Sequence, residues 1–347
     1  MRAFYHPDQA LHDPQQYMRF GQVIAAKDLP TRTEKLLATL KRRNIPIERP
    51  AANGLAAARA VHTSAYLAFL ETAWDRWTQL PERGPEVWPN TFPYWSGRPE
   101  EDARPPCPAR GLIAQVGWHL GDLSVPMGPR SFTSIARSVD AAIAAADDLL
   151  GGARTAYALC RPSGHHARAD RASGFCYVNN TATAAQHLRQ RFGKIAILDV
   201  DAHHGDGTQQ IFYNRPDILT VSVHADPDDF YPFFTGYPQE TGHGAGAGFN
   251  LNLPLAHGAT IEAMCAAIDA ASERIAAFGA EALVVALGYD AHACDPLGVL
   301  KLQSKDFAVI GEQVRAIGLP ALIVQEGGYA IDDIGDCLDA FIGGLGA

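Results

Sequence analysis

The chain has 347 residues, a formal net charge of −9 and 47% hydrophobic residues. This composition is typical of a globular protein, and the length, although large for one domain, is common among α/β domains. No run of lysine and arginine is present, which argues against nucleic acid as a partner. No apolar stretch approaches the roughly 20 residues that span a bilayer, so we expect no membrane association.

The amino terminus and the cysteines indicate the compartment. Residues 1–6 contain no long apolar segment, so a signal peptide is not expected. The six cysteines are scattered and form no CxxC pair, so their spacing does not favour disulfides. Three of them lie in or beside apolar runs, which predicts reduced thiols in a cytoplasmic protein.

Short apolar runs alternate with segments of helical periodicity, the pattern of parallel strands joined by crossover helices. In chain order we predict a helix around 135–146, a strand at 156–160, a helix at 180–191, strands at 195–199 and 218–223, a helix at 261–278, and strands at 283–287 and 321–325. Glycines at 151–152, 193 and 279 are expected to end the helices. The strands are apolar throughout, as expected when both faces are covered. The sequence therefore predicts one α/β domain over 1–347, with a mostly parallel sheet flanked by helices on both faces.

The segment from about 81 to 130 departs from this pattern. It holds ten of the 23 prolines and three of the five tryptophans. Its aromatic residues would be costly to leave in water, which argues against disorder; they are Trp88, Phe92, Tyr94, Trp95 and Trp118. We expect a loop insertion that contacts a partner or borders the substrate site.

Polar residues cluster just past the carboxyl ends of the predicted strands, where open α/β sheets bind their ligands. After 195–199 come Asp201 and His203, which can reach one cation together, and after 283–287 comes Asp290. A catalytic zinc site needs three such N or O ligands and an open position. In an isolated Asp-x-His motif, the simpler interpretation is that the aspartate caps a helix and the histidine packs against its neighbours. The neighbouring Asp199, His204 and Asp206, with flanking glycines, favour the metal site.

Two further clusters supply groups for acid–base chemistry. His165 and His166 follow the strand at 156–160; alone they could be a solvated pair, but the rigid Arg161-Pro162 entry places them near a ligand. We predict that they act as general base and acid, with His165 paired to Asp199 and His166 to Asp206. Tyr329 follows Gly327-Gly328. It could be an ordinary half-buried tyrosine, or its phenol could donate to an oxyanion, which is typically worth about 3 kcal/mol of barrier.

These motifs resemble those of the zinc-dependent histone deacetylase superfamily. They are Arg161-Pro-x-Gly-His-His166, Asp199-x-Asp-x-His-His-Gly-Asp-Gly207, Leu287-Gly-x-Asp290 and Gly327-Gly-Tyr329. Leu70-Glu-Thr-Ala-Trp74-Asp-Arg-Trp77 and Glu240-Thr-Gly-x-Gly-Ala-Gly-Ala-Gly248 are similar to the bacterial acetylpolyamine amidohydrolases of that family. The resemblance implies the arginase/deacetylase fold and a hydrolase that removes acetyl groups from small amines.

The resemblance also implies cofactors, partners and further site residues. It implies a catalytic Zn²⁺ and a structural monovalent cation, K⁺ or Na⁺. The monovalent cation would be held partly by backbone atoms of Asp199, Asp201 and His203, with Ser222 and Val223. It implies a substrate tunnel lined by Gly174, Phe175, Tyr231 and Leu297. The partners implied are a small acetylated amine and a second copy of the chain, with a homodimer formed through the loop at 81–130.

The sequence departs from the amidohydrolase pattern at two places. The positions that align with the acids expected to hold the distal ammonium are Ile113 and Ser124, so Asp122 or the run Glu100-Glu101-Asp102 would have to substitute. His292 stands where binuclear relatives carry a second metal-binding aspartate, and we expect it to form hydrogen bonds outside the metal site.

Three alternatives stay open from the sequence. A protein acyl-lysine deacetylase would use the same mechanism. A binuclear manganese ureohydrolase would need the carboxylate that His292 replaces. A zinc-containing acetyl sensor without activity would be expected to lose Tyr329 or the histidine pair, and both are present.

Overall fold

A computed structural model describes residues 1–93 and 104–347. Eight strands form one sheet in the order β4-β1-β5-β10-β9-β6-β7-β8, and every pairing within it is parallel. The strands are β1 (Arg2–Phe4), β4 (Ile47–Glu48), β5 (Thr155–Ala158), β6 (Ile195–Asp199), β7 (Ile218–Ala225), β8 (Asn250–Leu255), β9 (Ala282–Leu287) and β10 (Ala321–Gln325). A separate antiparallel hairpin joins β2 (Gln16–Arg19) to β3 (Gln22–Ala25).

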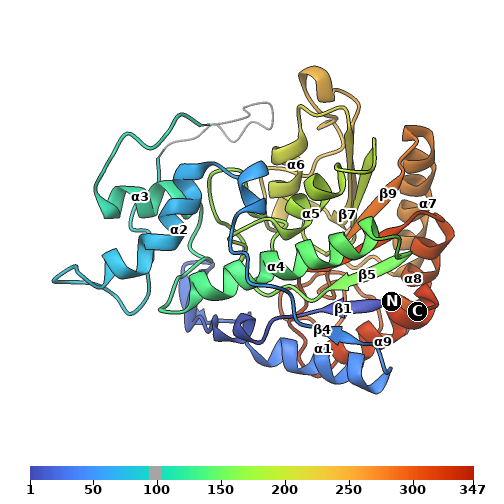
Figure 1. Cartoon of the computed structure of the whole chain (residues 1–347), viewed down its shortest axis with the longest axis horizontal. Helices are drawn as coiled ribbons and strands as arrows, with labels where there is room; N and C mark the ends of the chain where they lie inside the picture. Colours follow the sequence, from blue (N-terminus) through green and yellow to red (C-terminus); the bar gives the residue numbers. More distant parts are fainter. Residues whose placement is uncertain (94–103) are drawn as a thin grey trace.

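Helices cover both faces of the sheet (Figure 1). One layer contains α4 (Ser131–Leu150), α5 (Asn180–Leu188) and α6 (Asp206–Phe212), and the other contains α1 (Thr31–Arg42), α7 (Ile261–Phe278), α8 (Asp306–Ala316) and α9 (Ile334–Leu345). Consecutive strand residues alternate between the two cores: Val284 packs with the α4–α5 layer, whereas Leu283 and Val285 pack with the α7–α9 layer. This double burial explains the uninterrupted apolar runs, and the predicted fold class is confirmed.

The central elements lie close to the predicted bounds, and the differences occur at the ends. The strand expected at 156–160 ends at Ala158, and the helix expected to reach 191 ends at Leu188, so Gly193 is not its C-cap. Gly279 does cap α7, with a left-handed φ of 73°. The strands β1, β4 and β8, which form the outer parts of the sheet, and the helices α1, α6, α8 and α9 were not predicted from the sequence.

The segment from 81 to 130 is more regular than expected. It contains α3 (Leu112–His119), which packs beside α2 (Ser64–Trp77) in a third apolar cluster, and Val87 bridges to Met127. Of its aromatic residues, Tyr94 and Trp95 lie outside the described residues. The six cysteines are free thiols. Among the described residues, no helix is long and apolar enough to cross a membrane.

Candidate active site

The candidate metal ligands converge at the carboxyl ends of two neighbouring strands. Asp201 and His203 follow β6, and Asp290 follows β9, which pairs with β6. One donor atom from each lies within 4.8 Å of the others. His203 Nδ1 is 3.0 Å from Asp290 Oδ2 and 3.2 Å from Asp201 Oδ1. The parallel register therefore brings together residues almost 90 positions apart.

Backbone groups fix both carboxylates. Asp201 Oδ2 accepts from the N–H of Gly327 at 2.8 Å, and Asp290 Oδ1 accepts from the N–H of Ala202 at 2.8 Å. The other oxygen of each carboxylate faces the His203 imidazole. A Cβ at Gly288 would lie 1.9 Å from Asp201 Oδ2, and one at Gly327 would lie 2.2 Å from Asp290 Oδ2. Only glycine fits at these two positions, because the carboxylates occupy the space that a side chain would need.

This donor set fits a divalent ion. The two carboxylates are almost completely buried and lie against each other, an arrangement that is costly without a positive charge between them. Two carboxylate oxygens and one imidazole nitrogen are the N and O ligands of catalytic zinc sites, which leave a fourth position open. His203 is further held by Phe230, whose ring stacks on the imidazole with 4.4 Å between centroids.

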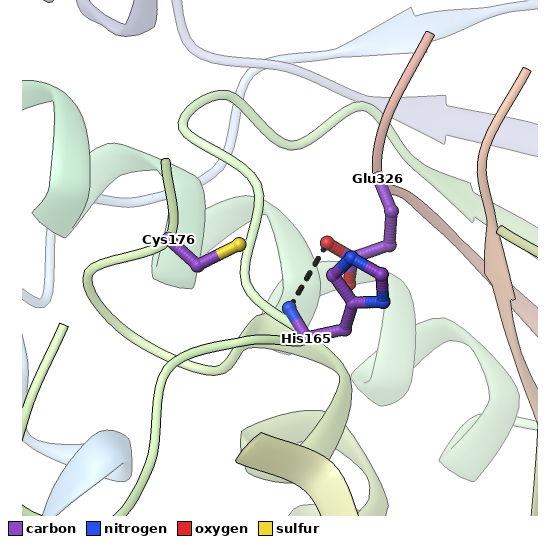
Figure 2. Close-up of side chains that lie close together, drawn as sticks. All are labelled: His165, Cys176 and Glu326. Carbon is purple, nitrogen blue, oxygen red and sulfur yellow. Dashed lines mark hydrogen bonds between the residues drawn. The ribbon is translucent and has the colours of Figure 1, made fainter. Parts of the chain in front are cut away.

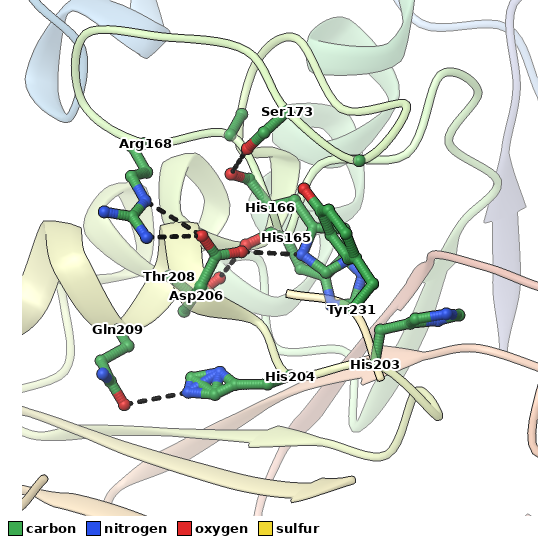
Figure 3. Close-up of polar contacts among 12 residues, drawn as sticks. His165, His166, Arg168, Ser173, His203, His204, Asp206, Thr208, Gln209 and Tyr231 are labelled. Carbon is green, nitrogen blue, oxygen red and sulfur yellow. Dashed lines mark hydrogen bonds and ion pairs between the residues drawn. The ribbon is translucent and has the colours of Figure 1, made fainter. Parts of the chain in front are cut away.

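The histidine pair lies beside this cluster, and each imidazole meets a different carboxylate. His165 Nδ1 is 2.9 Å from Asp199 Oδ2. His166 Nδ1 is 2.8 Å from Asp206 Oδ1, as Figure 3 shows. Both hydrogen bonds match the pairs expected from the sequence. Each leaves the Nε2 atom of the ring available for proton transfer.

The two imidazoles have opposite electrostatic surroundings. Burial lowers the pKa of His165, but the charges of Asp199 and Asp201 outweigh it and raise that pKa well above its usual value. Burial and the charge of His165 lower the pKa of His166 to about 4, and they outweigh the hydrogen bond that Asp206 accepts from the ring, which raises that pKa. His166 is therefore held in its neutral form, in which the ring can accept a proton.

Arg168 completes the contacts of Asp206, and no pattern in the sequence pointed to it. Its Nε and Nη2 atoms each lie 2.9 Å from Asp206 Oδ2, the oxygen that does not meet His166 (Figure 3). Burial raises the pKa of Asp206, but Arg168 and His166 outweigh it and hold that pKa well below its usual range. Asp206 therefore stays ionised next to His166.

Glu326 lies behind the histidine pair, in a buried cluster with His165 and Cys176 (Figure 2). Its Oε2 atom accepts from the N–H groups of Gly164 at 2.6 Å and His165 at 3.2 Å, and Oε1 accepts from Thr181 Oγ1 at 2.8 Å. Burial raises the pKa of Glu326 to about 7. This carboxyl group fixes the backbone that carries His165 and His166.

Tyr329 is positioned by a buried arginine, Arg32, which was not predicted from the sequence. Arg32 donates to the carbonyls of Gly328 at 2.6 Å and Glu326 at 2.7 Å, and its guanidinium lies 4.7 Å from the Tyr329 ring centroid. Burial raises the pKa of Tyr329 well above 10, so its hydroxyl keeps its proton. Asp28 in turn accepts from Arg32 at 2.7 Å and from Arg161 at 2.9 Å.

A cavity of about 260 Å³ leads to this cluster. His166, His203 and Tyr329 line it together with all four residues expected to form the tunnel, Gly174, Phe175, Tyr231 and Leu297. Gly174 (φ 54°) and Phe175 (φ 63°) have left-handed backbones. A Cβ at Gly174 would lie 2.4 Å from His166 Cδ2, so glycine lets the wall pass directly over that imidazole.

Of the residues considered for binding the distal ammonium at the tunnel mouth, the structure places some at the cavity and not others. Asp122 and Ser124 line the cavity, whereas Ile113 is an exposed residue of α3 outside its lining. Asp122 Oδ2 accepts from Tyr231 at 2.8 Å and from the N–H of Gly174 at 3.0 Å. Glu100, Glu101 and Asp102 lie outside the described residues.

Two remaining sequence expectations concern neighbours of the metal cluster. His292 Nε2 is 3.2 Å from Ser304 Oγ, and its Nδ1 accepts from the N–H of Cys294 at 3.3 Å, so its hydrogen bonds lie away from the metal ligands. Ser222 stands opposite Asp199 in the β6–β7 register, with Val223 next to it. Ser222 Oγ is hydrogen-bonded to His224 Nδ1 at 2.8 Å.

Comparisons with known proteins agree with this architecture. Residues 26–345 match the histone deacetylase domain family. The acetylpolyamine amidohydrolase of Burkholderia pseudomallei is 42% identical over 100% of this chain and 99% of its own, and that of Mycoplana ramosa is 40% identical over 96% of each. The crystal structure of the Burkholderia pseudomallei acetylpolyamine aminohydrolase superimposes with a TM-score of 0.95 over 100% of this chain and 99% of its own, at 42% identity. The chain belongs to the histone deacetylase family.

Proposed function

We propose that this chain is a zinc-dependent amidohydrolase that removes acetyl groups from small amines such as acetylpolyamines. One observation carries the proposal: His203, which belongs to the cluster of candidate metal ligands with Asp201 and Asp290, lines one cavity with aromatic walls together with His166 and Tyr329. The full-length similarity to acetylpolyamine amidohydrolases supports the amine substrate class.

The ligands would be Asp201, His203 and Asp290. Zinc held by them would supply Lewis-acid chemistry, polarising the acyl carbonyl and making water more acidic. The chain's own residues move the protons. His165 or His166 would take the proton of the attacking water, and His166 would return one to the departing amine nitrogen. Asp199 and Asp206 would hold the two rings in the required tautomer and orientation.

Tyr329 would donate its hydroxyl hydrogen to the oxyanion that forms when the carbonyl is attacked. Its raised pKa supports this role, because the phenol stays protonated at neutral pH. Arg32 supports it too, since its hydrogen bonds to Glu326 and Gly328 fix the turn that carries the tyrosine. A donor aimed in advance at a developing charge lowers the barrier by about 3 kcal/mol.

The walls of the cavity suit a narrow chain of methylene groups. Phe175 meets Tyr17 and Tyr329 edge to face, with ring centroids 5.1 and 5.6 Å apart, so its position is fixed. Tyr231 meets His166 edge to face at 4.9 Å. These contacts favour a linear amide over a bulky one, and they do not separate a free amine from the side chain of an acyl-lysine in a protein.

We propose two further features of the family for this chain. A structural K⁺ or Na⁺ would lie beside Asp199, with Ser222 and Val223; the alignment of Asp199 with Ser222 across two strands supports it. A homodimer would form through the segment 81–130, where Phe92 and Ile113 expose apolar side chains. Size-exclusion chromatography with light scattering checks the second proposal. A cytoplasmic location stays a prediction from the sequence.

A substrate panel tests the main proposal. The zinc-loaded protein is assayed with acetylputrescine, acetylcadaverine, acetylspermidine and an acetyl-lysine peptide, and with urea-cycle guanidino compounds as the ureohydrolase control. We expect acetate release from the acetylated amines, abolished by chelation and restored by zinc. Full turnover after exhaustive chelation, or activity on guanidino substrates alone, would overturn the proposal.

A further inference from the structure

The mouth of the cavity carries a positive charge that the removal of acetyl groups from polyamines does not need. Arg19 lines the same cavity whose base holds His166, His203 and Tyr329. It ends strand β2 at the tip of the β2–β3 hairpin. A guanidinium here would repel the distal ammonium of a polyamine, so its presence calls for another explanation.

Arg19 is held at the mouth by its neighbours. The N–H of Met18 donates to the carbonyl of Leu123 at 3.0 Å, which places Arg19 and Asp122 on two adjacent segments joined by a hydrogen bond. Arg19 Nη1 donates to the Pro296 carbonyl at 3.1 Å, and its guanidinium lies 5.0 Å from the Phe20 ring centroid. Within residues 1–93 and 104–347, no carboxylate lies in ion-pair distance of it. Its position is fixed while its charge stays available to a ligand.

Two carboxylates line the mouth, Asp122 and Asp229, and they differ in how freely they can contact a cationic group of the substrate. Both oxygens of Asp122 already accept hydrogen bonds, Oδ1 from the N–H and hydroxyl of Ser124 and Oδ2 from Gly174 and Tyr231. Asp122 therefore contributes its charge and holds the rim, with its lone pairs used. Asp229 also lines the cavity and is exposed, so it can meet a cation directly. The mouth thus presents a cation and an anion to the outer end of a substrate.

We propose that Arg19 is a specificity-determining residue that binds a carboxylate at the outer end of the substrate, so that the preferred substrates include free Nω-acetylated diamino acids. In such a molecule the acetylated side-chain nitrogen reaches the base of the cavity. The α-carboxylate meets Arg19, and the α-ammonium meets the negative charge of Asp229 and Asp122. A guanidinium is well suited to this contact, because its fork matches a carboxylate. The inference rests on the proposed deacetylase function and narrows its substrate class.

A matched pair of substrates isolates the carboxylate. Nε-acetyl-L-lysine and N-acetylcadaverine differ only in that the first carries a carboxylate on the carbon next to its free amine. We expect Arg19→Met to lower kcat/KM for acetyl-lysine about tenfold, mainly through KM, because one charge-assisted contact is lost. The same variant should leave acetylcadaverine unchanged or improve it. Arg19→Lys should retain part of the acetyl-lysine rate.

Salt dependence gives a second measurement that a purely structural role would not change. The wild-type ratio of kcat/KM for acetyl-lysine over acetylcadaverine should fall as ionic strength rises, and this dependence should weaken in Arg19→Met. Arg59 is exposed and does not line the cavity, so Arg59→Met serves as the charge-matched control. It should change kcat/KM for neither substrate. Zinc content and thermal unfolding confirm that each variant is folded.

The outcomes separate this inference from the function on which it rests. An equal loss on both substrates, or no change on either, in Arg19→Met would overturn the role of Arg19 while the deacetylase stands. Wild-type activity on acetylcadaverine alone would do the same. A folded, zinc-loaded wild-type protein that releases acetate from neither substrate would overturn both.

Discussion

In the part of the chain that the structure describes, Asp28 is the only carboxylate within ion-pair distance of two buried guanidinium groups, those of Arg32 and Arg161. Its replacement by asparagine tests how strongly these buried ion pairs stabilise the fold and the turn that carries Tyr329. Its side chain is 2% exposed, and one oxygen accepts from both Arg32 and Arg161. Burial raises the pKa of Asp28, but Arg161 and Arg32 outweigh it and lower the pKa from 3.8 to about 2. That difference corresponds to roughly 2–3 kcal/mol in favour of the ionised form.

Asp28→Asn keeps the shape of the side chain and removes the charge. Breaking a buried ion pair by neutralising one partner typically costs about 3–5 kcal/mol, because the other charge stays buried without compensation. We therefore expect the free energy of unfolding to fall by at least about 2 kcal/mol, measured by urea denaturation at pH 7. Activity should fall as well, since Arg32 orients the turn that carries Tyr329.

The pH dependence has a definite sign. The folded pKa of Asp28 is lower than the unfolded one, so its stabilising contribution is present above about pH 4 and is lost as the pH falls toward about 2. The difference between wild type and Asp28→Asn should therefore shrink over that window. Asp332→Asn is the matched control, because its ion pair with Lys35 at 3.7 Å is exposed and should contribute less than about 1 kcal/mol. A loss below about 0.5 kcal/mol for Asp28→Asn would refute the reasoning.

Four further predictions concern the site itself. Tyr329→Phe should retain zinc, measured by metal analysis, and lose roughly 100-fold in kcat; wild-type turnover would contradict the oxyanion role. His166→Ala should lose nearly all activity while remaining folded, and substantial residual turnover would remove it as the acid. Asp290→Ala should fail to retain zinc on dialysis, and stoichiometric zinc in it would exclude the proposed ligand set. Arg168→Met should lower kcat roughly tenfold in the wild-type background, but it should have little effect on kcat when Asp206→Asn is already present. Equal effects in both backgrounds would show that Arg168 does not act through Asp206.

The sequence predicted the centre of the fold better than its edges. The strands at 195–199 and 321–325 have the predicted bounds because their side chains are buried on both faces, which leaves a continuous apolar run. β1 and β4 have three and two residues, too few to show any periodicity. The hairpin of β2 and β3 lies apart from the main sheet, and its strands have only four residues each, which is too short for a clear periodicity.

The candidate site divides in the same way. Its reactive side chains follow recognisable strands, so their common location could be predicted from topology alone. The residues that hold them could not be predicted. Arg32 meets Glu326 almost 300 positions away, and Arg168 meets Asp206 across 38, and neither contact leaves a spacing pattern in the sequence. Only the tertiary structure shows that Arg19 faces the cavity.

The position of Gly327 over Asp201 links metal capture to the completion of folding. The two carboxylates that we propose as metal ligands follow β6 and β9, and the N–H that orients one of them comes from the loop after β10. A nascent chain that ends before this loop would carry all three proposed ligands but would lack the N–H that orients Asp201. Zinc affinity should therefore rise when the last central strand docks, and added zinc should stabilise that docked state over partly assembled forms.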